Sequence, residues 1–245
     1  MGLKDAVRLA HRPELCRRAK YIMPILFLAI FLFSSPFAHS LERSEITFYA
    51  GFENTLTADI AKGKKEPIDA KSCKFAEGIL GKGVITDERI TFDYDKNINA
   101  KEATVSVWAK PLNWGSSDIK TGQYNFVYFH GSPAMQITTV YWGVTRFYLY
   151  YPGEKEATNI PQYGAFWEAG RWRNLVVTWK SEKEVQFFID GVMIGRITEN
   201  VVPIKNGINF SIGAPNMVFD ELMVFKRALK HEEVRALFYG VKKDK

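Results

Sequence analysis

Residues 172–195, WRNLVVTWKSEKEVQFFIDGVMIG, carry the clearest structural signal in the chain. Leu175–Trp179 is rich in β-branched and aromatic residues, and residues 185–190 then alternate with the period of two that is typical of a half-buried strand. Asp190-Gly191 follows, and this pair favours a type I′ turn, which needs positive φ at both central residues. The stretch therefore predicts three antiparallel strands, the third beginning at Val192, and we expect the rest of the chain to pack on them.

Short strands separated by Gly- and Pro-containing turns are predicted along most of the chain. They cover residues 46–52, 90–94, 105–110, 125–131, 135–141, 146–151, 208–212 and 218–225. Residues 152–169 are expected to be a long connection, and 232–239 a short helix that ends at Gly240 and protects an open sheet edge. Many short strands of this kind indicate a sandwich of two antiparallel sheets. The 245 residues are enough for one large domain of this type.

Five segments also resemble, in order, a known family. They are ATVSVWAKP (103–111), VQFFIDG (185–191), FSIG (210–213), FDELMVFKRAL (219–229) and EEVRALFY (232–239). Together they resemble the concanavalin A-like lectin/glucanase superfamily, and within it the laminin G-like jelly-roll domain. The resemblance implies an all-β, two-sheet antiparallel jelly-roll sandwich over residues 41–240, with a short C-terminal helix and a basic tail at 241–245.

The first 40 residues are expected to be a secretory signal peptide. A basic region up to Lys20 precedes an apolar run from Tyr21 to Phe33, and Ala38–Ser40 supplies small residues for cleavage after Ser40. The alternative is an uncleaved anchor, because the apolar run extended from Tyr21 to Ala38 approaches the length of a membrane span. Cleavage predicts a secreted, periplasmic or cell-surface protein with no membrane span after signal removal.

Charge and cysteine content restrict the classes of partner. The first 40 residues hold six of the 33 Lys and Arg residues and two of the 27 Asp and Glu residues, so the remainder has a net charge of +2 instead of +6. No basic stripe remains that would indicate nucleic-acid binding. After cleavage Cys73 is the sole cysteine, which excludes an intramolecular disulfide.

The sequence argues against catalysis. Glycosidases of the superfamily carry paired carboxylates in an E-x-D-x-x-E pattern, and this chain lacks that pattern. Two closely spaced acidic pairs lie beside turns and are read as solvated charges: Asp93 with Asp95, and Glu182 with Glu184. His130 has no acid or Ser partner nearby in sequence, and His231 begins the predicted helix. We therefore expect no catalytic residues, with a degenerate glycoside hydrolase as an alternative.

The resemblance implies one structural calcium ion where the first and last strands of the fold meet. The matching positions are Glu53, Asn54 and Asp220, which would supply the oxygen ligands that calcium prefers. The Ala58–Gly63 run departs from the family pattern that follows the first strand. An equally weighted alternative is that Asp220 accepts backbone hydrogen bonds at a strand end.

Aromatic residues gather between residues 124 and 167 and indicate a binding surface. In the strand at 146–151, Tyr148 and Tyr150 point to the face opposite Phe147 and Leu149, and tyrosine suits both sugar faces and protein interfaces. The predicted ligand-binding residues are Trp142, Tyr148, Tyr150, Tyr163 and Trp167. The expected function is that of an exported, non-catalytic carbohydrate-binding module, with a protein-binding adhesion or structural module as the alternative.

Overall fold

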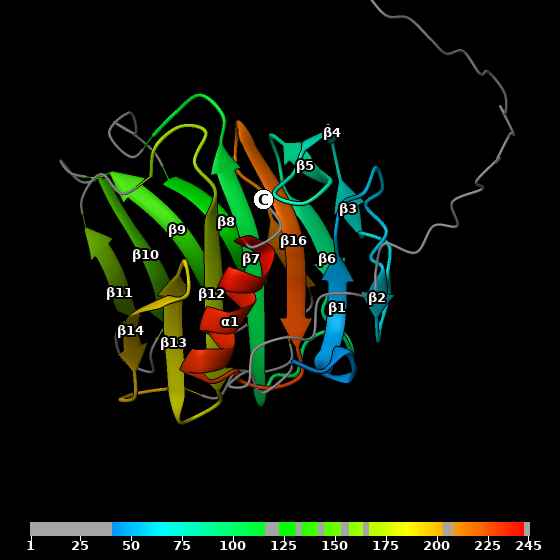
Figure 1. The fold of residues 1–245 in the computed structure, drawn as a ribbon. Coiled ribbons are helices and arrows are strands. Elements are labelled where there is room, and N and C mark those ends of the chain that lie inside the picture. Colours follow the sequence, from blue (N-terminus) through cyan, green and yellow to red (C-terminus); the bar gives the residue numbers. More distant parts are fainter. Residues whose placement is uncertain are drawn as a thin grey trace, which may run out of the picture. The chain divides into compact units, whose positions relative to one another are not determined.

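The computed structural model describes residues 41–115, 123–130, 134–141, 145–152, 157–163, 167–202, 207 and 209–242. These residues form two antiparallel sheets, which we call sheet A and sheet B (Figure 1). The path of sheet A runs β14 (Val192–Ile197), β13 (Glu184–Ile189), β12 (Arg173–Lys180), β7 (Glu102–Pro111), β16 (Met217–Phe225), β1 (Ile46–Ala50) and β2 (Ile60–Ala61). β5 (Lys82–Thr86) adds to β16, and β4 (Lys74–Glu77) adds to β5, while a 3₁₀ turn at Arg43–Glu45 precedes β1.

Sheet B has seven strands among the described residues. In spatial order they are β11 (Ala157–Tyr163), β10 (Thr145–Pro152), β9 (Met135–Tyr141), β8 (Gln123–His130), β15 (Asn209–Ile212), β6 (Ile90–Asp93) and β3 (Asp69–Ala70). The neighbours β8 and β15 are far apart in sequence, as are β7 and β16 in sheet A. Both sheets therefore depend on pairing between strands from distant parts of the chain. The predicted all-β, two-sheet jelly-roll sandwich is confirmed.

The meander predicted from residues 172–195 is confirmed as β12, β13 and β14. Asp190 and Gly191 have φ values of 52° and 75°, as a type I′ turn requires. Leu175 pairs with Ile189, and Val185 pairs with Ile197, so their alternate side chains share one face. That face is buried against sheet B, and Val177 and Phe187 there are fully inaccessible to solvent.

The core between the sheets is rich in aromatic side chains. Phe48 of β1 packs edge-on against Phe92 of β6 and Phe210 of β15, with ring centroids 4.9 and 5.3 Å away. Phe129 of β8 similarly meets Trp179 of β12 at 5.6 Å. Edge-to-face pairs of this kind stabilise a core by more than the burial of their apolar area alone. They therefore strengthen the packing of the two sheets on each other.

The C-terminal helix α1 (His231–Lys242) lies on the outer face of sheet A (Figure 1). Val234, Phe238 and Val241 recur at helical spacing and are buried, and the Phe238 ring stacks on Trp108 of β7 at 5.5 Å. The expectation that the helix protects an open sheet edge is therefore wrong: it covers a sheet face. Gly240 lies inside the helix and does not end it.

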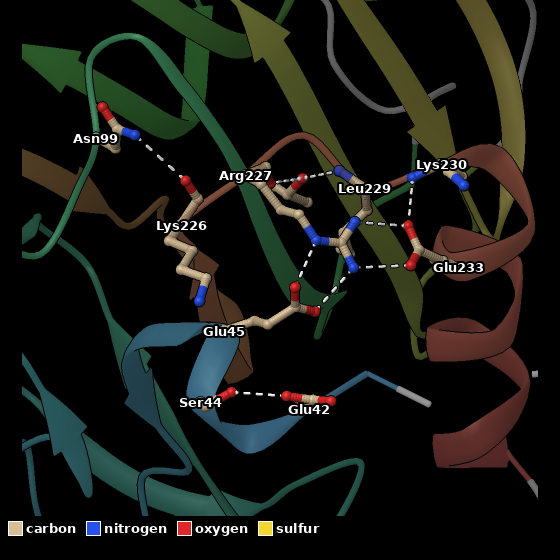
Figure 2. A network of polar contacts seen from close by, with 10 residues as sticks. Glu42, Ser44, Glu45, Asn99, Lys226, Arg227, Leu229, Lys230 and Glu233 are labelled. Atoms are coloured by element: carbon tan, nitrogen blue, oxygen red, sulfur yellow. Dashed lines mark hydrogen bonds and ion pairs between the residues drawn. The ribbon is translucent and has the colours of Figure 1, made fainter. Parts of the chain in front are cut away.

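A charged network ties this helix to the start of the fold (Figure 2). The Arg227 guanidinium donates two hydrogen bonds to Glu45, at 2.6 and 2.8 Å, and two to Glu233 of α1, both at 2.8 Å. These hydrogen bonds are the main reason that the pKa of Arg227 is raised and those of Glu45 and Glu233 are lowered. The three side chains are therefore charged over the physiological pH range.

Five strands were absent from the sequence prediction: the short strands β2, β3, β4 and β5, and the longer strand β11. β11 lies within the predicted 152–169 connection and forms the edge of sheet B, where Pro161 pairs with Tyr148. Its sequence, ATNIPQY, is polar and contains a proline, which lacks a ladder N–H and is tolerated at a sheet edge. In the described part of the chain, no helix has the length and apolar character needed to cross a membrane.

Candidate ligand-binding face

The outer face of sheet B is the candidate functional site. Along each strand the inward residues are apolar, such as Ile90 and Phe92 in β6. The residues between them are polar or aromatic with a polar group, because successive side chains of a strand alternate between the two faces. The residues that project from this outer face include Thr91, Tyr128, His130, Gln136, Thr138, Tyr148, Tyr150 and Ser211.

Five of these residues form one row across five strands. Tyr150 pairs with Gln136, Gln136 with Tyr128, Tyr128 with Ser211, and Ser211 with Thr91. Neighbouring strands lie about 4.8 Å apart, so this row runs for about 19 Å across the sheet. Tyr150, Gln136 and Tyr128 are partly exposed, which leaves two phenol rings and an amide available to a ligand.

A hydrogen-bonded chain links His130 to the Ser211 and Thr91 end of the row. His130 Nε2 lies 2.7 Å from Ser211 Oγ, and Ser211 Oγ lies 3.1 Å from Thr91 Oγ1. Burial lowers the pKa of His130, and the charge of Arg89 lowers it further, so the imidazole is neutral at neutral pH. Ser211 is only 1% exposed, so it positions the His130 ring and is not accessible as a nucleophile.

Arg89 adds a positive charge to this face. Arg89 immediately precedes β6, and its guanidinium carbon lies 4.6 Å from the centroid of the Tyr128 ring. The ring of Tyr128 also meets His130, with centroids 4.4 Å apart and the two planes 67° to one another. Arg89, Tyr128 and His130 therefore form one contiguous cluster of partly exposed cation, phenol and imidazole.

The structure places two of the predicted binding residues on this face. Tyr148 and Tyr150 project outward from β10, opposite the buried Leu149, as predicted from the alternation. Tyr150 is partly exposed and belongs to the row. Tyr148 is only 6% exposed and its cross-strand neighbour Thr138 is fully buried, so this end of the face is covered.

The other three predicted binding residues do not add to the described face. Trp167 is 2% exposed and packs in the core against Phe126, with ring centroids 5.2 Å apart, while its indole N–H donates to the Arg171 carbonyl at 2.8 Å. Tyr163 is in β11, and its side chain is outside the described set. Trp142 lies outside the described residues altogether.

Sequence reasoning missed Arg89, Tyr128, His130 and Ser211 as one cluster. His130 and Ser211 are 81 residues apart, and the pairing of β8 with β15 brings them together. The alternation of outward polar residues in 127–130 and 209–212 was the one available signal. It did not show which strands would become neighbours.

Two of the predicted calcium ligands converge on one turn. Asp220 Oδ2 accepts hydrogen bonds from the N–H groups of Ile79 and Leu80, at 2.8 and 3.1 Å. Glu53 Oε1 accepts from the N–H of Lys82 at 3.0 Å. Asn54, the third predicted ligand, is exposed in the left-handed conformation with φ of 58°.

The geometry around Asp220 fits a carboxylate that accepts backbone hydrogen bonds. Its second oxygen accepts from the N–H of Glu221 at 2.8 Å, so both oxygens are already engaged. Within the described ranges, no group of three or more His, Cys, Asp and Glu side chains is placed to hold a metal ion. Glu53 and Asp220 each accept backbone hydrogen bonds in the structure, and the calcium site stays a prediction.

A second buried acid adjoins Asp220. Glu221 has φ of 52° at a bulge in β16 and accepts a hydrogen bond from the Tyr49 hydroxyl at 2.8 Å. Burial and the neighbouring Glu221 charge raise the pKa of Asp220 to about 8. Burial, with the charges of Glu53 and Asp59, raises that of Glu221 to about 7.

The acidic pairs weighed as catalytic candidates are engaged or exposed. Asp93 accepts a hydrogen bond from the Asp95 N–H and pairs with Lys64 at 3.1 Å, and these contacts lower its pKa. Glu184 is held by Gln186, Arg196 and Lys180, and these contacts outweigh burial and lower its pKa. Asp95 and Glu182 are exposed. A general acid needs a raised pKa, and the environments of Asp93 and Glu184 act in the opposite direction.

The topology and the exposed sheet face define a jelly-roll domain of the lectin and glucanase type. Consistent with this, residues 85–235 match the family described as the concanavalin A-like lectin/glucanases superfamily, in its laminin G-like branch. The chain belongs to this superfamily. No curated protein matches the sequence.

Solved structures with the same fold include both sugar-binding and receptor-binding domains. Domain 4 of AbnA, a GH43 extracellular arabinanase from Geobacillus stearothermophilus solved in complex with arabinotriose, is 20% identical. Its TM-score is 0.61, and the match covers 79% of this chain and 98% of that domain. At this identity, the likeness shows the fold alone.

Two toxin domains are also similar in fold. The binding domain of Paraclostridial mosquitocidal protein 1 is 17% identical with a TM-score of 0.59, and the match covers 80% of this chain and 52% of that one. The binding domain of botulinum neurotoxin DC, solved in complex with rat synaptotagmin II, is 14% identical with a TM-score of 0.62, covering 81% and 52%. This chain thus spans about half the length of these toxin domains.

Proposed function

We propose that the protein is an exported, non-catalytic carbohydrate-binding module whose sugar site is the outer face of sheet B. The observation that carries this proposal is the cross-strand row in which Tyr150 and Tyr128 flank Gln136. Tyrosine rings offer apolar plates to sugar faces, and the intervening amide and hydroxyl groups suit sugar hydroxyls. The arabinotriose-bound arabinanase domain supports the proposal as a relative in fold.

The proposal that the module is non-catalytic rests on the acidic residues of this face. In the described strands of sheet B, two acidic residues lie beside the row. Asp69 of β3 is exposed and pairs with Thr91, and the pKa of Asp93 is lowered by the Asp95 N–H and by Lys64, which does not suit a general acid. Glycoside hydrolysis needs two carboxylates on either side of the scissile bond. Export rests on the basic, apolar and small-residue order of residues 1–40.

Glycan binding by the Tyr150→Ala variant tests the proposed site. A glycan array identifies a bound sugar for the wild type, and calorimetry then compares affinities. We expect about tenfold weaker binding or worse for Tyr150→Ala, because a stacking plate is lost, with an unchanged melting temperature. The matched control is Tyr239→Ala, since Tyr239 is a 47% exposed tyrosine on α1, away from sheet B.

Equal affinity of the Tyr150→Ala variant and the wild type would move the site away from this face. The alternative function is protein binding, for which the synaptotagmin-bound toxin domain is the relative in fold. A wild-type chain that binds no glycan on the array, yet binds a protein partner through the same tyrosine, would establish that alternative.

A further inference from the structure

Arg89 differs from most arginines of the described fold because it has no acidic partner there. Arg173, Arg196 and Arg227 each form an ion pair with a carboxylate. Arg89 is partly exposed and contacts the Tyr128 ring instead, at 4.6 Å from its centroid. An arginine that stacks on an aromatic ring keeps its N–H donors for an incoming anion.

Among the described residues, no carboxylate lies within ion-pair distance of Arg89, and Asp69 of the neighbouring strand β3 pairs with Thr91. Glu88, its neighbour in sequence, lies 3.9 Å from Lys71, and Asp93 on the same strand lies 3.1 Å from Lys64. His130 also contacts the Tyr128 ring, and burial followed by the charge of Arg89 lowers the pKa of His130. The cluster of Arg89, Tyr128 and His130 therefore presents one cation beside neutral hydrogen-bonding groups, and the exposed Asp69 lies beyond it at the Thr91 end of the row.

We propose that this face selects acidic glycans and that Arg89 binds the carboxylate of a hexuronate unit. The inference rests on the proposed function of sheet B and specifies its ligand. A guanidinium matches a carboxylate with two parallel hydrogen bonds, which a neutral sugar cannot accept with the same strength. Tyr150 and Gln136 of the row then contact the neighbouring sugar units.

The experiment compares each acidic polymer with its own carboxyl-reduced form. Polygalacturonate, alginate and hyaluronate are titrated beside reduced samples of the same linkage, and dextran sulfate beside dextran tests sulfate as an alternative anion. The wild type is expected to bind at least one uronate polymer about tenfold more tightly than its reduced form. This difference should shrink as salt is raised from 50 to 500 mM, since added salt screens charges.

Three variants locate the selectivity. Arg89→Ala should bind the acidic and reduced polymers equally, and Arg89→Lys should keep part of the preference because the charge remains without the planar fork. Arg235→Ala is the matched control, because Arg235 also lies over a tyrosine, Tyr239 at 5.6 Å, but on α1. It should keep the full preference, and all three variants should melt like the wild type.

The outcomes separate this inference from the proposed function. Binding to reduced or neutral polymers without preference for uronate would overturn the inference and leave the carbohydrate-binding proposal standing. A uronate preference that survives in Arg89→Ala, or a preference for dextran sulfate alone, would also overturn it. A chain that binds none of the polymers and no array glycan would overturn both.

Discussion

Asp220 and Glu221 carry the strongest pH dependence expected of any described residues. Burial and the charge of Glu221 raise the pKa of Asp220 from 3.8 to about 8, and burial with the charges of Glu53 and Asp59 raises that of Glu221 from 4.5 to about 7. Because the folded state binds these protons more tightly, the stability they contribute is complete below about pH 4. It is lost as the pH rises through 7 to 8.

Urea unfolding with a chelator present should therefore show falling stability from pH 5 to pH 8.5. We expect a decrease in the free energy of unfolding of at least about 2 kcal/mol. Glu221→Gln keeps an acceptor for the Tyr49 hydroxyl but cannot ionise, so its profile should be flatter near pH 7. A wild-type profile that stays level or rises over this range would contradict the prediction.

Melting temperatures measured with calcium and with chelator decide whether Asp220 is a calcium ligand or an acceptor of backbone hydrogen bonds. Bound calcium would favour the ionised carboxylates, raise the melting temperature at pH 8 and lose this effect in Asp220→Ala. Melting curves that do not respond to calcium would leave Asp220 as an acceptor of the Ile79, Leu80 and Glu221 N–H groups.

At the scale of elements, Arg227 joins the turn before β1 to helix α1. Arg227→Ala would leave Glu45 and Glu233 without their main partner, and the Glu233 side chain is only 5% exposed. We expect a loss of about 2–3 kcal/mol in the free energy of unfolding, measured with urea, because a buried charge is left unpaired. The helix should also become more accessible to proteolysis.

A matched control comes from an exposed arginine of sheet A. Arg196 pairs with Glu184, but its side chain is 53% exposed, so Arg196→Ala should cost no more than about 1 kcal/mol. Similar losses for both variants would show that the Arg227 network adds nothing beyond an ordinary surface ion pair.

Burial determines which of the predicted aromatic residues are accessible to a ligand. Tyr148 was predicted from the same strand alternation as Tyr150, and Trp167 as an aromatic residue of the 152–169 connection, yet the structure buries Tyr148 and Trp167 almost completely. Alternation along β10 correctly assigned Tyr148 and Tyr150 to one face. It could not show that one end of that face is covered, because burial depends on segments distant in sequence.

For the whole molecule, the signal peptide predicted at residues 1–40 is expected to direct export. We expect mass spectrometry of the exported chain to begin at Leu41 or within a few residues of it, because Ala38 and Ser40 provide the small side chains for cleavage. An exported form that retains Met1 would instead support the membrane-anchor alternative.

The sequence alone was sufficient for the fold class and the central meander. Strand periodicity and the Asp190-Gly191 turn depend on contacts between near neighbours, which are written directly in the order of residues. Family resemblance extended this to the jelly roll, which the 85–235 match and the sheet topology confirm. The edge strand β11 escaped because Pro161 and polar residues weaken its local signal.

The candidate site required the tertiary structure. The pairing of β8 with β15 and of β15 with β6 brings His130, Ser211 and Thr91 into one hydrogen-bonded chain from three separate parts of the sequence. Packing also placed α1 on a sheet face and left Arg89 beside Tyr128 without an acid. Such contacts depend on which strands become neighbours and what covers them, and local sequence patterns do not contain that information.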